Sequence, residues 1–201
     1  ELGVIVARNS LGKTSIFPVV ESVFDPKVNL VSSLIAPANI DENTAAKAQA
    51  LALQVLEAMD FEGLMAVELF LDSDGALLVN EVAPRTHNSG HHTIEANKTS
   101  QFAQHLRAVV GLPLGDVSLL HNAAGMINLL GAAGAYGTPV YEGLSEAQSI
   151  PGVHPHLYGK SDVKPYRKMG HVTVTGSDLD LVQEILLKLR ESICVSGTKE
   201  K

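Results

Sequence analysis

Apolar and polar positions along the chain follow two periods, and from these periods we predict its secondary structure. Runs of β-branched and aliphatic residues predict strands, and apolar residues that recur every three or four positions predict helices. The expected strands are 2–8, 15–23, 63–72, 76–83, 124–130, 152–158 and 169–175. The expected helices are 44–59, 100–110 and 178–193. Segment 24–43 is expected to be irregular, and the tail 196–201 is expected to be disordered.

The mixed order of these elements predicts an α+β fold, in which a largely antiparallel sheet is flanked by helices. Residues 9–12 are turn formers and join the first two strands as a hairpin. The Gly-Leu-Pro sequence at 111–113 ends the middle helix and marks the best internal boundary. We therefore expect one lobe over residues 1–112 and a small β-rich subdomain over residues 113–201.

Composition narrows the class of protein. The 201 residues are 45% hydrophobic, which is enough for one core with a smaller lobe attached. No run approaches the roughly 18 apolar residues of a membrane helix, and no signal peptide precedes the first strand. The single cysteine, Cys194, fits a reducing compartment, so we expect a cytoplasmic protein without membrane contact. The chain opens within a strand pattern and without an initiator Met, so we expect it to be a fragment of a longer protein.

The charge of the chain limits its partners. A net charge of −7 argues against nucleic acid. An anionic substrate would therefore need a local basic cluster or a metal ion.

Two glutamates are expected to face each other across a hairpin. Asp74-Gly75 favours a two-residue type I′ turn, because both central positions of that turn need positive φ. Residues then pair when their numbers add up to 149, which sets Glu68 opposite Glu81 with Cβ atoms about 4.5–5.5 Å apart. Paired like charges indicate a protonated carboxyl or a bound cation, and oxygen ligands beside Asn80 suit Mg²⁺. The alternatives are two solvated glutamates, or a three-residue loop with a bulge that offsets the pair by one position.

The segment 80–93, NEVAPRTHNSGHHT, gathers polar and titratable groups directly after an apolar run. Its histidines His87, His91 and His92 could ligate zinc. However, residues 88–90 favour a turn over the helix that a His-x₃-His pair needs, and no cysteine or acidic third ligand is close by. The loop could instead offer donors and a close backbone approach to a small anion, or it could be purely structural.

The segment 158–171, YGKSDVKPYRKMGH, concentrates positive charge in an otherwise acidic chain. Its cations are Lys160, Lys164, Arg167 and Lys168. Such a cluster is either a solvated face or the docking site of a phosphate monoester. The glycine-rich segment 131–137 lacks the Lys-Ser/Thr ending of a phosphate loop and is expected to be a flexible turn.

Several strings carry a specific resemblance to a known family. They are AVELF, LLVNEVAPRTHNSGHHTIEA, TSQFAQHLRAVVGLPLG, MINLLG, YGK and RKMGHVTV, in this order. On these strings the chain resembles the carboxy-terminal part of the 5-(carboxyamino)imidazole ribonucleotide synthetases. These are ATP-grasp ligases of purine biosynthesis, also named as the ATPase subunit of phosphoribosylaminoimidazole carboxylase. The resemblance covers essentially all 201 residues and implies an ATP-grasp carboxy-terminal lobe followed by the small β-rich subdomain.

The resemblance implies which residues bind ATP and its metal ion. Glu68 and Glu81 match the family's Mg²⁺ ligands, in agreement with the pairing argument. Asn80 and Glu81 are implied beside the ATP phosphates, and Glu1 matches the acidic residue that holds the ATP ribose.

The resemblance also implies the residues that bind the other substrates. Arg85, His87 and Asn88 fall where bicarbonate meets 5-aminoimidazole ribonucleotide and are implied as catalytic, with Arg85 also binding substrate. Lys160 and Arg167 match the basic pair that grips the ribonucleotide phosphate.

The implied reaction uses ATP to phosphorylate bicarbonate, and the resulting carboxyphosphate carboxylates the exocyclic amine of 5-aminoimidazole ribonucleotide. ADP and phosphate are released. Mg²⁺ and Arg85 would neutralise the charge of the transferring group, and no protein nucleophile is required. The family also implies a homodimer.

Two departures from the family stand beside this resemblance. Phe24 occupies a position where relatives usually carry a histidine that contacts the nucleotide. The family's amino-terminal domain, glycine-rich lid and adenine hinge fall outside these residues, so the isolated chain is expected to be inactive. Two alternatives remain: another ATP-grasp carboxylase or ligase, and a non-catalytic nucleotide- or zinc-binding module.

Overall fold

The computed structural model describes residues 1–25 and 30–200, in which short strands alternate with a few helices. The strands are β1 (Leu2–Arg8), β2 (Thr14–Ile16), β3 (Val20–Asp25), β4 (Leu30–Ala36), β5 (Gly63–Leu71), β6 (Leu77–Ala83), β7 (Ala123–Leu130), β8 (Ala135–Glu142), β9 (Val153–Leu157), β10 (Lys168–Gly176) and β11 (Cys194–Glu200). The helices are α1 (Glu42–Ala58), the 3₁₀ turn η1 (Asn88–Gly90), α2 (Thr93–Ala96), α3 (Gln101–Val109), α4 (Leu144–Gln148) and α5 (Leu179–Ser192). No helix within these described ranges is long and apolar enough to cross a membrane.

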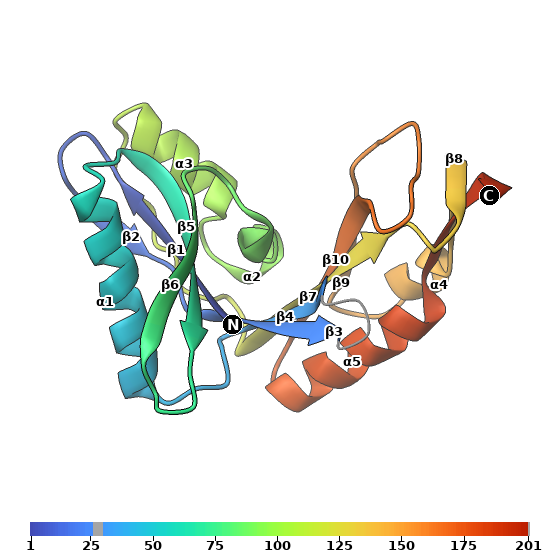
Figure 1. Ribbon diagram of the computed structural model, residues 1–201, viewed down its shortest axis with the longest axis horizontal. Coiled ribbons are helices and arrows are strands. Elements are labelled where there is room, and N and C mark those ends of the chain that lie inside the picture. The colour runs from blue at the N-terminus through green and yellow to red at the C-terminus, as the bar shows by residue number, and fades with distance from the viewer. Residues whose placement is uncertain (26–29, 201) are drawn as a thin grey trace.

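One sheet runs through both halves of the molecule. Its strand order is β6-β5-β1-β3-β4-β7-β10-β9, and β2 pairs with β1 beside this path. The pairings between its described strands are antiparallel, which confirms the predicted α+β fold with a largely antiparallel sheet. Figure 1 shows that β3 and β4 connect the first half, with β1, β5 and β6, to the second half, with β7, β9 and β10. A separate two-stranded sheet pairs β8 with β11.

Helices cover both faces of the first half of the sheet. Side chains of β1 alternate between the two faces, so they contribute to two separate cores. Val4 and Val6 are buried in the core that contains Leu56 of α1. Ile5 belongs to the core on the opposite face, where Gly90 of η1 lies directly against it. This second face, which η1 and α3 cover, carries the candidate site.

The second half of the sheet presents one face to α5 and the other to the first half. Ile127 of β7 and Val172 of β10 are buried in one core with Leu186 of α5. Their neighbours Asn128 and His171 are paired across the two strands. Because side chains alternate along a strand, these two polar side chains point away from α5 and toward η1 and α2.

Part of the segment that was expected to be irregular is a central strand, so that prediction was wrong. β4 pairs with β3 on one side and with β7 on the other, and Leu34, Ile35 and Ala36 are buried. Pro37 follows the strand directly, whereas Pro26 lies outside the described residues. The burial of β4 depends on β7, which is far away in sequence, so the local pattern did not show it.

Three further predictions need correction at the level of single elements. The expected strand 15–23 is divided into β2 and β3 around Pro18, which lacks the N–H that a ladder requires. Residues 196–200 of the tail that was expected to be disordered belong to β11, and β8 begins inside the segment expected to be a flexible turn. These two strands pair with each other. They are far apart along the chain, so the local pattern of either segment does not reveal the pairing.

Candidate functional site

The structure confirms that Glu68 pairs with Glu81 across β5 and β6, but the hairpin reaches this register by an unexpected route. The loop consists of the three residues 73–75 and is closed by a backbone hydrogen bond of 3.0 Å between the residues that flank it. Such a loop alone would offset the pairing by one position. Asn80 is an extra, bulged residue of β6 that restores the register. The predicted two-residue turn was therefore wrong, and two offsets cancel at the carboxylate pair.

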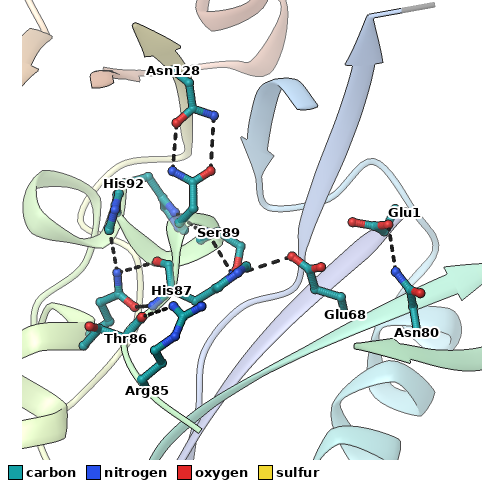
Figure 2. Close-up of polar contacts among 12 residues, drawn as sticks. Glu1, Glu68, Asn80, Arg85, Thr86, His87, Ser89, His92 and Asn128 are labelled. Carbon is teal, nitrogen blue, oxygen red and sulfur yellow. Dashed lines mark hydrogen bonds and ion pairs between the residues drawn. The ribbon is translucent and has the colours of Figure 1, made fainter. Parts of the chain in front are cut away.

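Carboxylates of β5, of β6 and of the residue before β1 gather on this face of the sheet. Glu1 directly precedes β1, and its Oε2 accepts a hydrogen bond of 3.3 Å from Asn80 Nδ2 (Figure 2). Burial raises the pKa of Glu68, and the charges of Glu1 and Glu81 raise it further, whereas Lys168 lowers it. A bound cation would relieve this repulsion.

The donor set fits a hard cation that takes additional ligands. In the described part of the chain, no three His, Cys, Asp or Glu side chains are close enough to hold a metal ion by themselves. Mg²⁺ commonly binds through only one or two carboxylates and completes its shell with water and phosphate oxygens. The pair Glu68 and Glu81 therefore suits Mg²⁺ in the presence of a phosphorylated ligand.

The loop 87–90 lies directly on the sheet, because Gly90 leaves room for it. A Cβ at this position would lie 2.2 Å from Ile5 Cδ1 and 2.6 Å from Gln101 Oε1. The Gln101 side chain also fastens the loop: its Oε1 accepts from the backbone N of His87 at 2.9 Å, and its Nε2 donates to the backbone O of His87 at 2.8 Å. The start of the loop is thus fixed to α3.

His87 faces Glu68 as a neutral ring. Its Nδ1 accepts a hydrogen bond from the backbone N–H of Ser89 and lies 2.9 Å from Ser89 Oγ, which favours the tautomer with the ring proton on Nε2. Burial lowers the pKa of His87, and the charges of Arg85 and Lys168 lower it further. The 3.5 Å approach of Nδ1 to Glu68 Oε1 (Figure 2) is therefore not an ion pair at neutral pH. A neutral His87 can donate Nε2–H to an anion.

The other two histidines of this segment have separate surroundings, which argues against a shared zinc ion. His92 is 3% exposed, and its Nδ1 lies 3.1 Å from the carbonyl oxygen of Ser89. His91 stacks on Phe102 of α3 with 5.7 Å between ring centroids. Each of these two rings therefore makes a contact that stabilises the fold and needs no metal ion.

Asn88 links the two halves of the molecule through reciprocal amide hydrogen bonds. Its Nδ2 donates to Asn128 Oδ1 at 2.8 Å, and Asn128 Nδ2 donates back to Asn88 Oδ1 at 3.2 Å (Figure 2). Lys168 Nζ donates to the same Asn88 Oδ1 at 3.1 Å. Lys168 is exposed as a whole residue, but desolvation of its ammonium group lowers its pKa, and Glu68 opposes this shift. Lys168 thus brings a positive charge toward the carboxylates.

The basic residues predicted to bind phosphate lie together on the loop between β9 and β10. Lys160 Nζ donates to the backbone O of Lys168. Arg167 Nη1 donates to the backbone O of Asp162 at 2.8 Å. Burial lowers the pKa of Lys160, and the nearby charge of Arg167 lowers it further. Two cations that lie this close to each other would favour a bound anion.

A cleft of about 290 Å³ has Glu1 and Glu68 of the first half and Lys168 of the second half in its lining. Its lining consists of Glu1, Phe24, Val31, Glu68, His87, Asn88, Leu130, Tyr166 and Lys168. Four of the predicted site residues meet here, and Phe24 places an apolar ring against them. The remaining predicted residues lie outside this lining: Asn80, Glu81, Arg85, Lys160 and Arg167.

Arg85 stands close to the cleft without lining it. The residue is exposed, and its Nη1 donates to the backbone O of Thr86 at 3.0 Å (Figure 2). Its charge nevertheless acts on His87, whose pKa it lowers.

Lys168 and Asn128, which both bond to Asn88, were not among the predicted site residues. Lys168 belonged to the basic segment but was not singled out from it. Asn128 is the one strongly polar residue of the apolar segment 123–130, and this contrast is the signal that could have identified it.

Comparison with known proteins gives matches along most of the chain. A family model described as "ATP-grasp domain" matches residues 1–102. A second, described as "Phosphoribosylaminoimidazole carboxylase C-terminal domain", matches residues 124–185. The chain is 45% identical over 193 residues to the chloroplastic phosphoribosylaminoimidazole carboxylase of Vigna aconitifolia, an alignment that covers 95% of this chain and 34% of that protein. It is 43% identical over 189 residues to the N5-carboxyaminoimidazole ribonucleotide synthase of Bacillus subtilis, with 94% and 47% covered.

Solved structures share the fold. N5-carboxyaminoimidazole ribonucleotide synthetase from Thermotoga maritima superposes with a TM-score of 0.90 at 46% identity, covering 98% of this chain and 52% of that one. N5-carboxyaminoimidazole synthase from Aspergillus clavatus, in complex with ADP and 5-aminoimidazole ribonucleotide, gives a TM-score of 0.83 at 34% identity, covering 94% and 51%. The chain spans about half the length of these relatives, and a smaller share of the plant protein. With half of its residues matched by one domain model, the chain belongs to the ATP-grasp family.

Proposed function

We propose that this chain supplies part of the active site of an ATP-dependent ligase that carboxylates the amine of 5-aminoimidazole ribonucleotide, by way of carboxyphosphate. The observation that carries the proposal is that opposite charges from the two halves meet at one cleft: Glu1 and Glu68 from the first half, Lys168 from the second. A ligase that joins a phosphorylated donor to a phosphorylated acceptor needs a metal-binding end and a cationic end. The names of the relatives support the same chemistry, as do the ADP and 5-aminoimidazole ribonucleotide bound to the Aspergillus clavatus protein.

The carboxylate end is proposed to bind ATP with Mg²⁺. Glu68 and Glu81 would hold the metal ion, because they are paired on adjacent strands and because burial and like charge raise the pKa of Glu68. Mg²⁺ held there would neutralise phosphate charge during phosphoryl transfer. Asn80 and Glu1, joined by their 3.3 Å hydrogen bond, would face the phosphates and the ribose.

The loop after β6 is proposed to serve bicarbonate and the acceptor amine. Arg85 would stabilise the negative charge that develops as carboxyphosphate forms and breaks down. His87 would donate its Nε2–H to an oxygen of bicarbonate, since Ser89 engages its Nδ1. Asn88 would act by holding the Lys168 ammonium through Oδ1, at 3.1 Å.

The basic loop is proposed to bind the phosphate of the ribonucleotide. Lys160 and Arg167 are close enough for their charges to influence each other, and backbone carbonyls hold both side chains. A phosphate monoester would accept hydrogen bonds from both groups and replace their mutual repulsion by attraction.

Four finer points belong to the same proposal. Bicarbonate is the carbon donor, and the division into residues 1–112 and 113–201 separates ATP binding from binding of the ribonucleotide phosphate. A homodimeric assembly rests on the family resemblance. Phe24 is 37% exposed at the cleft and would contact the nucleotide through its apolar ring in place of a hydrogen bond.

Kinetics of the full-length protein test the proposal. A charge-assisted hydrogen bond contributes about 1.5–3 kcal/mol, so Lys160→Ala and Arg167→Ala should each raise the KM for the ribonucleotide by roughly 10- to 150-fold. The KM for ATP should stay nearly unchanged. Lys188→Ala is a matched control, because this lysine pairs with Glu184 on the exposed side of α5. An unchanged KM for the ribonucleotide in both variants would show that the basic loop is a solvated face.

A further inference from the structure

Three histidine rings are stacked beside the basic loop, and the proposed function gives them no role. We call His91, His156 and His171 the histidine stack. The ring centroid of His171 lies 4.9 Å from that of His91 and 4.5 Å from that of His156, with interplanar angles of 29° and 14°. His171, the central ring, is 2% exposed. The centre of the stack is therefore buried inside the fold.

The histidine stack joins the two halves of the molecule. His91 comes from the first half, where Gln101 Nε2 lies 3.0 Å from its Nδ1 and Phe102 stacks on its ring. His156 lies on β9, and its Nε2 is 2.7 Å from Glu95 Oε1 of α2. Both ends of the stack are thus held by the region of α2 and α3, so the stack determines how β9 and β10 lie against the first half.

Tyr158 connects the histidine stack to the basic loop. Its hydroxyl forms a hydrogen bond of 3.0 Å with His171 Nδ1, and its ring meets the ring of His91 edge-on at 6.1 Å. Gly159 follows with φ +65°, a conformation that side chains rarely adopt, so the chain turns at once toward Lys160. Lys160 Nζ then lies 5.5 Å from the centroid of the Tyr158 ring, within the range of a cation–π contact.

Two of the three rings, His91 and His171, carry no charge at neutral pH. Burial lowers the pKa of His171 to about 3 and that of His91 to about 4, and the neighbouring histidines add to both shifts. Burial raises the pKa of Tyr158 to about 12. These two uncharged rings do not attract a phosphate by charge, and the cation that lies over Tyr158 is Lys160. The stack supports that cation and is not itself a ligand.

We propose that Tyr158 and His171 are positioning residues, which hold the Lys160 ammonium where it meets the phosphate of the ribonucleotide. This inference rests on the proposed role of Lys160. The hydrogen bond to His171 fixes the Tyr158 ring, and the ring provides the face over which Lys160 lies. Loss of the hydrogen bond lets the ring turn, which weakens ribonucleotide binding and leaves ATP binding and the chemical step unchanged.

Tyr158→Phe in the full-length protein isolates the hydrogen bond, because the ring beneath Lys160 remains. A neutral hydrogen bond contributes about 0.5–1.5 kcal/mol, which corresponds to a rise of about 2- to 13-fold in the KM for the ribonucleotide. The kcat and the KM for ATP should keep their wild-type values. His171→Phe retains a ring in the stack and should give a similar rise. Tyr141→Phe, which removes a hydroxyl from the other side of the second half, is the control.

The decisive comparison places Tyr158→Phe in a Lys160→Ala background. If the hydroxyl acts through Lys160, its removal should have no further effect there. An equal rise in both backgrounds would overturn the positioning role. An unchanged KM for Tyr158→Phe, beside a raised KM for Lys160→Ala, would overturn it too and leave the proposed function standing. If Lys160→Ala itself had no effect, the proposed phosphate site and this inference would fall together.

Discussion

Two buried histidines should make the fold sensitive to mild acid. His92 and His171 are 3% and 2% exposed, and burial lowers their pKa values from 6.5 to about 4 and about 3. At about pH 5.5 both are therefore neutral in the folded chain, whereas the same histidines are protonated in the unfolded chain. Because the unfolded state binds more protons, this contribution to stability is complete above about pH 6.5 and is lost as the pH falls below it.

The expected loss is large on the scale of domain stability. At about pH 5.5 the solution is one unit below the unfolded pKa, so each histidine lowers the free energy of unfolding by about 1.4 kcal/mol and the two together by about 3 kcal/mol. Domains are stable by roughly 5–15 kcal/mol. Glu68 acts in the opposite direction, since its pKa is raised by burial and the folded state takes up its proton more readily than the unfolded state. A variant that lacks one of the histidines is needed to separate its contribution from that of Glu68.

Urea denaturation at about pH 7.5 and about pH 5.5, followed by circular dichroism, measures this loss. His171→Phe keeps a ring in the histidine stack and removes its titration, so its pH-dependent loss should be smaller than that of the wild type by about 1.4 kcal/mol. His121→Asn controls for the removal of an imidazole from an exposed turn. Equal losses in the wild type and in His171→Phe would refute the reasoning that burial keeps this ring neutral.

Three further predictions concern the loop and the carboxylates. Gly90→Ala should lower the free energy of unfolding by about 1–3 kcal/mol in urea denaturation, because its Cβ would lie 2.2 Å from Ile5 Cδ1; an unchanged midpoint would show that the loop can shift. Arg85→Ala in the full-length protein should lower kcat more than it raises the KM for the ribonucleotide, and a change in that KM alone would contradict its assigned role. Glu68→Gln should raise the Mg²⁺ concentration for half-maximal activity by about tenfold or more; an unaltered Mg²⁺ titration would exclude Glu68 as a ligand.

The parts of the fold that were predictable depend on residues close together in sequence. The long helices α1 and α5 show the 3.6-residue period, and β5 and β6 are joined by a short loop, so both could be located from the pattern. The pairing of Glu68 with Glu81 was predicted correctly, although the turn was not. A bulge leaves little trace in a pattern of apolar and polar residues, and here Asn80 cancels the offset of the loop.

The parts that were not predictable depend on contacts between distant segments. β4 is buried because β7 covers its second edge, and β8 and β11 are ordered by each other. In the candidate site, too, the local features were predictable and the contacts between distant segments were not. The local strings around Glu68 and His87 were identified, whereas the connection from Asn88 to Asn128 and Lys168 and the histidine stack appear only when the two halves of the sheet are assembled.

The reciprocal hydrogen bonds between Asn88 and Asn128 also define a length. Two amides bonded head to head span the space between η1 and β7, and each side chain contributes a single methylene group. Neither amide is charged, so this spacer should respond little to ionic strength, unlike the attraction between Lys168 and Glu68. The distance between η1, next to the carboxylates, and β7 in the second half is therefore set by the lengths of two side chains. Glutamine at either position would lengthen the spacer by one methylene and move η1 and β7 apart without altering any charge.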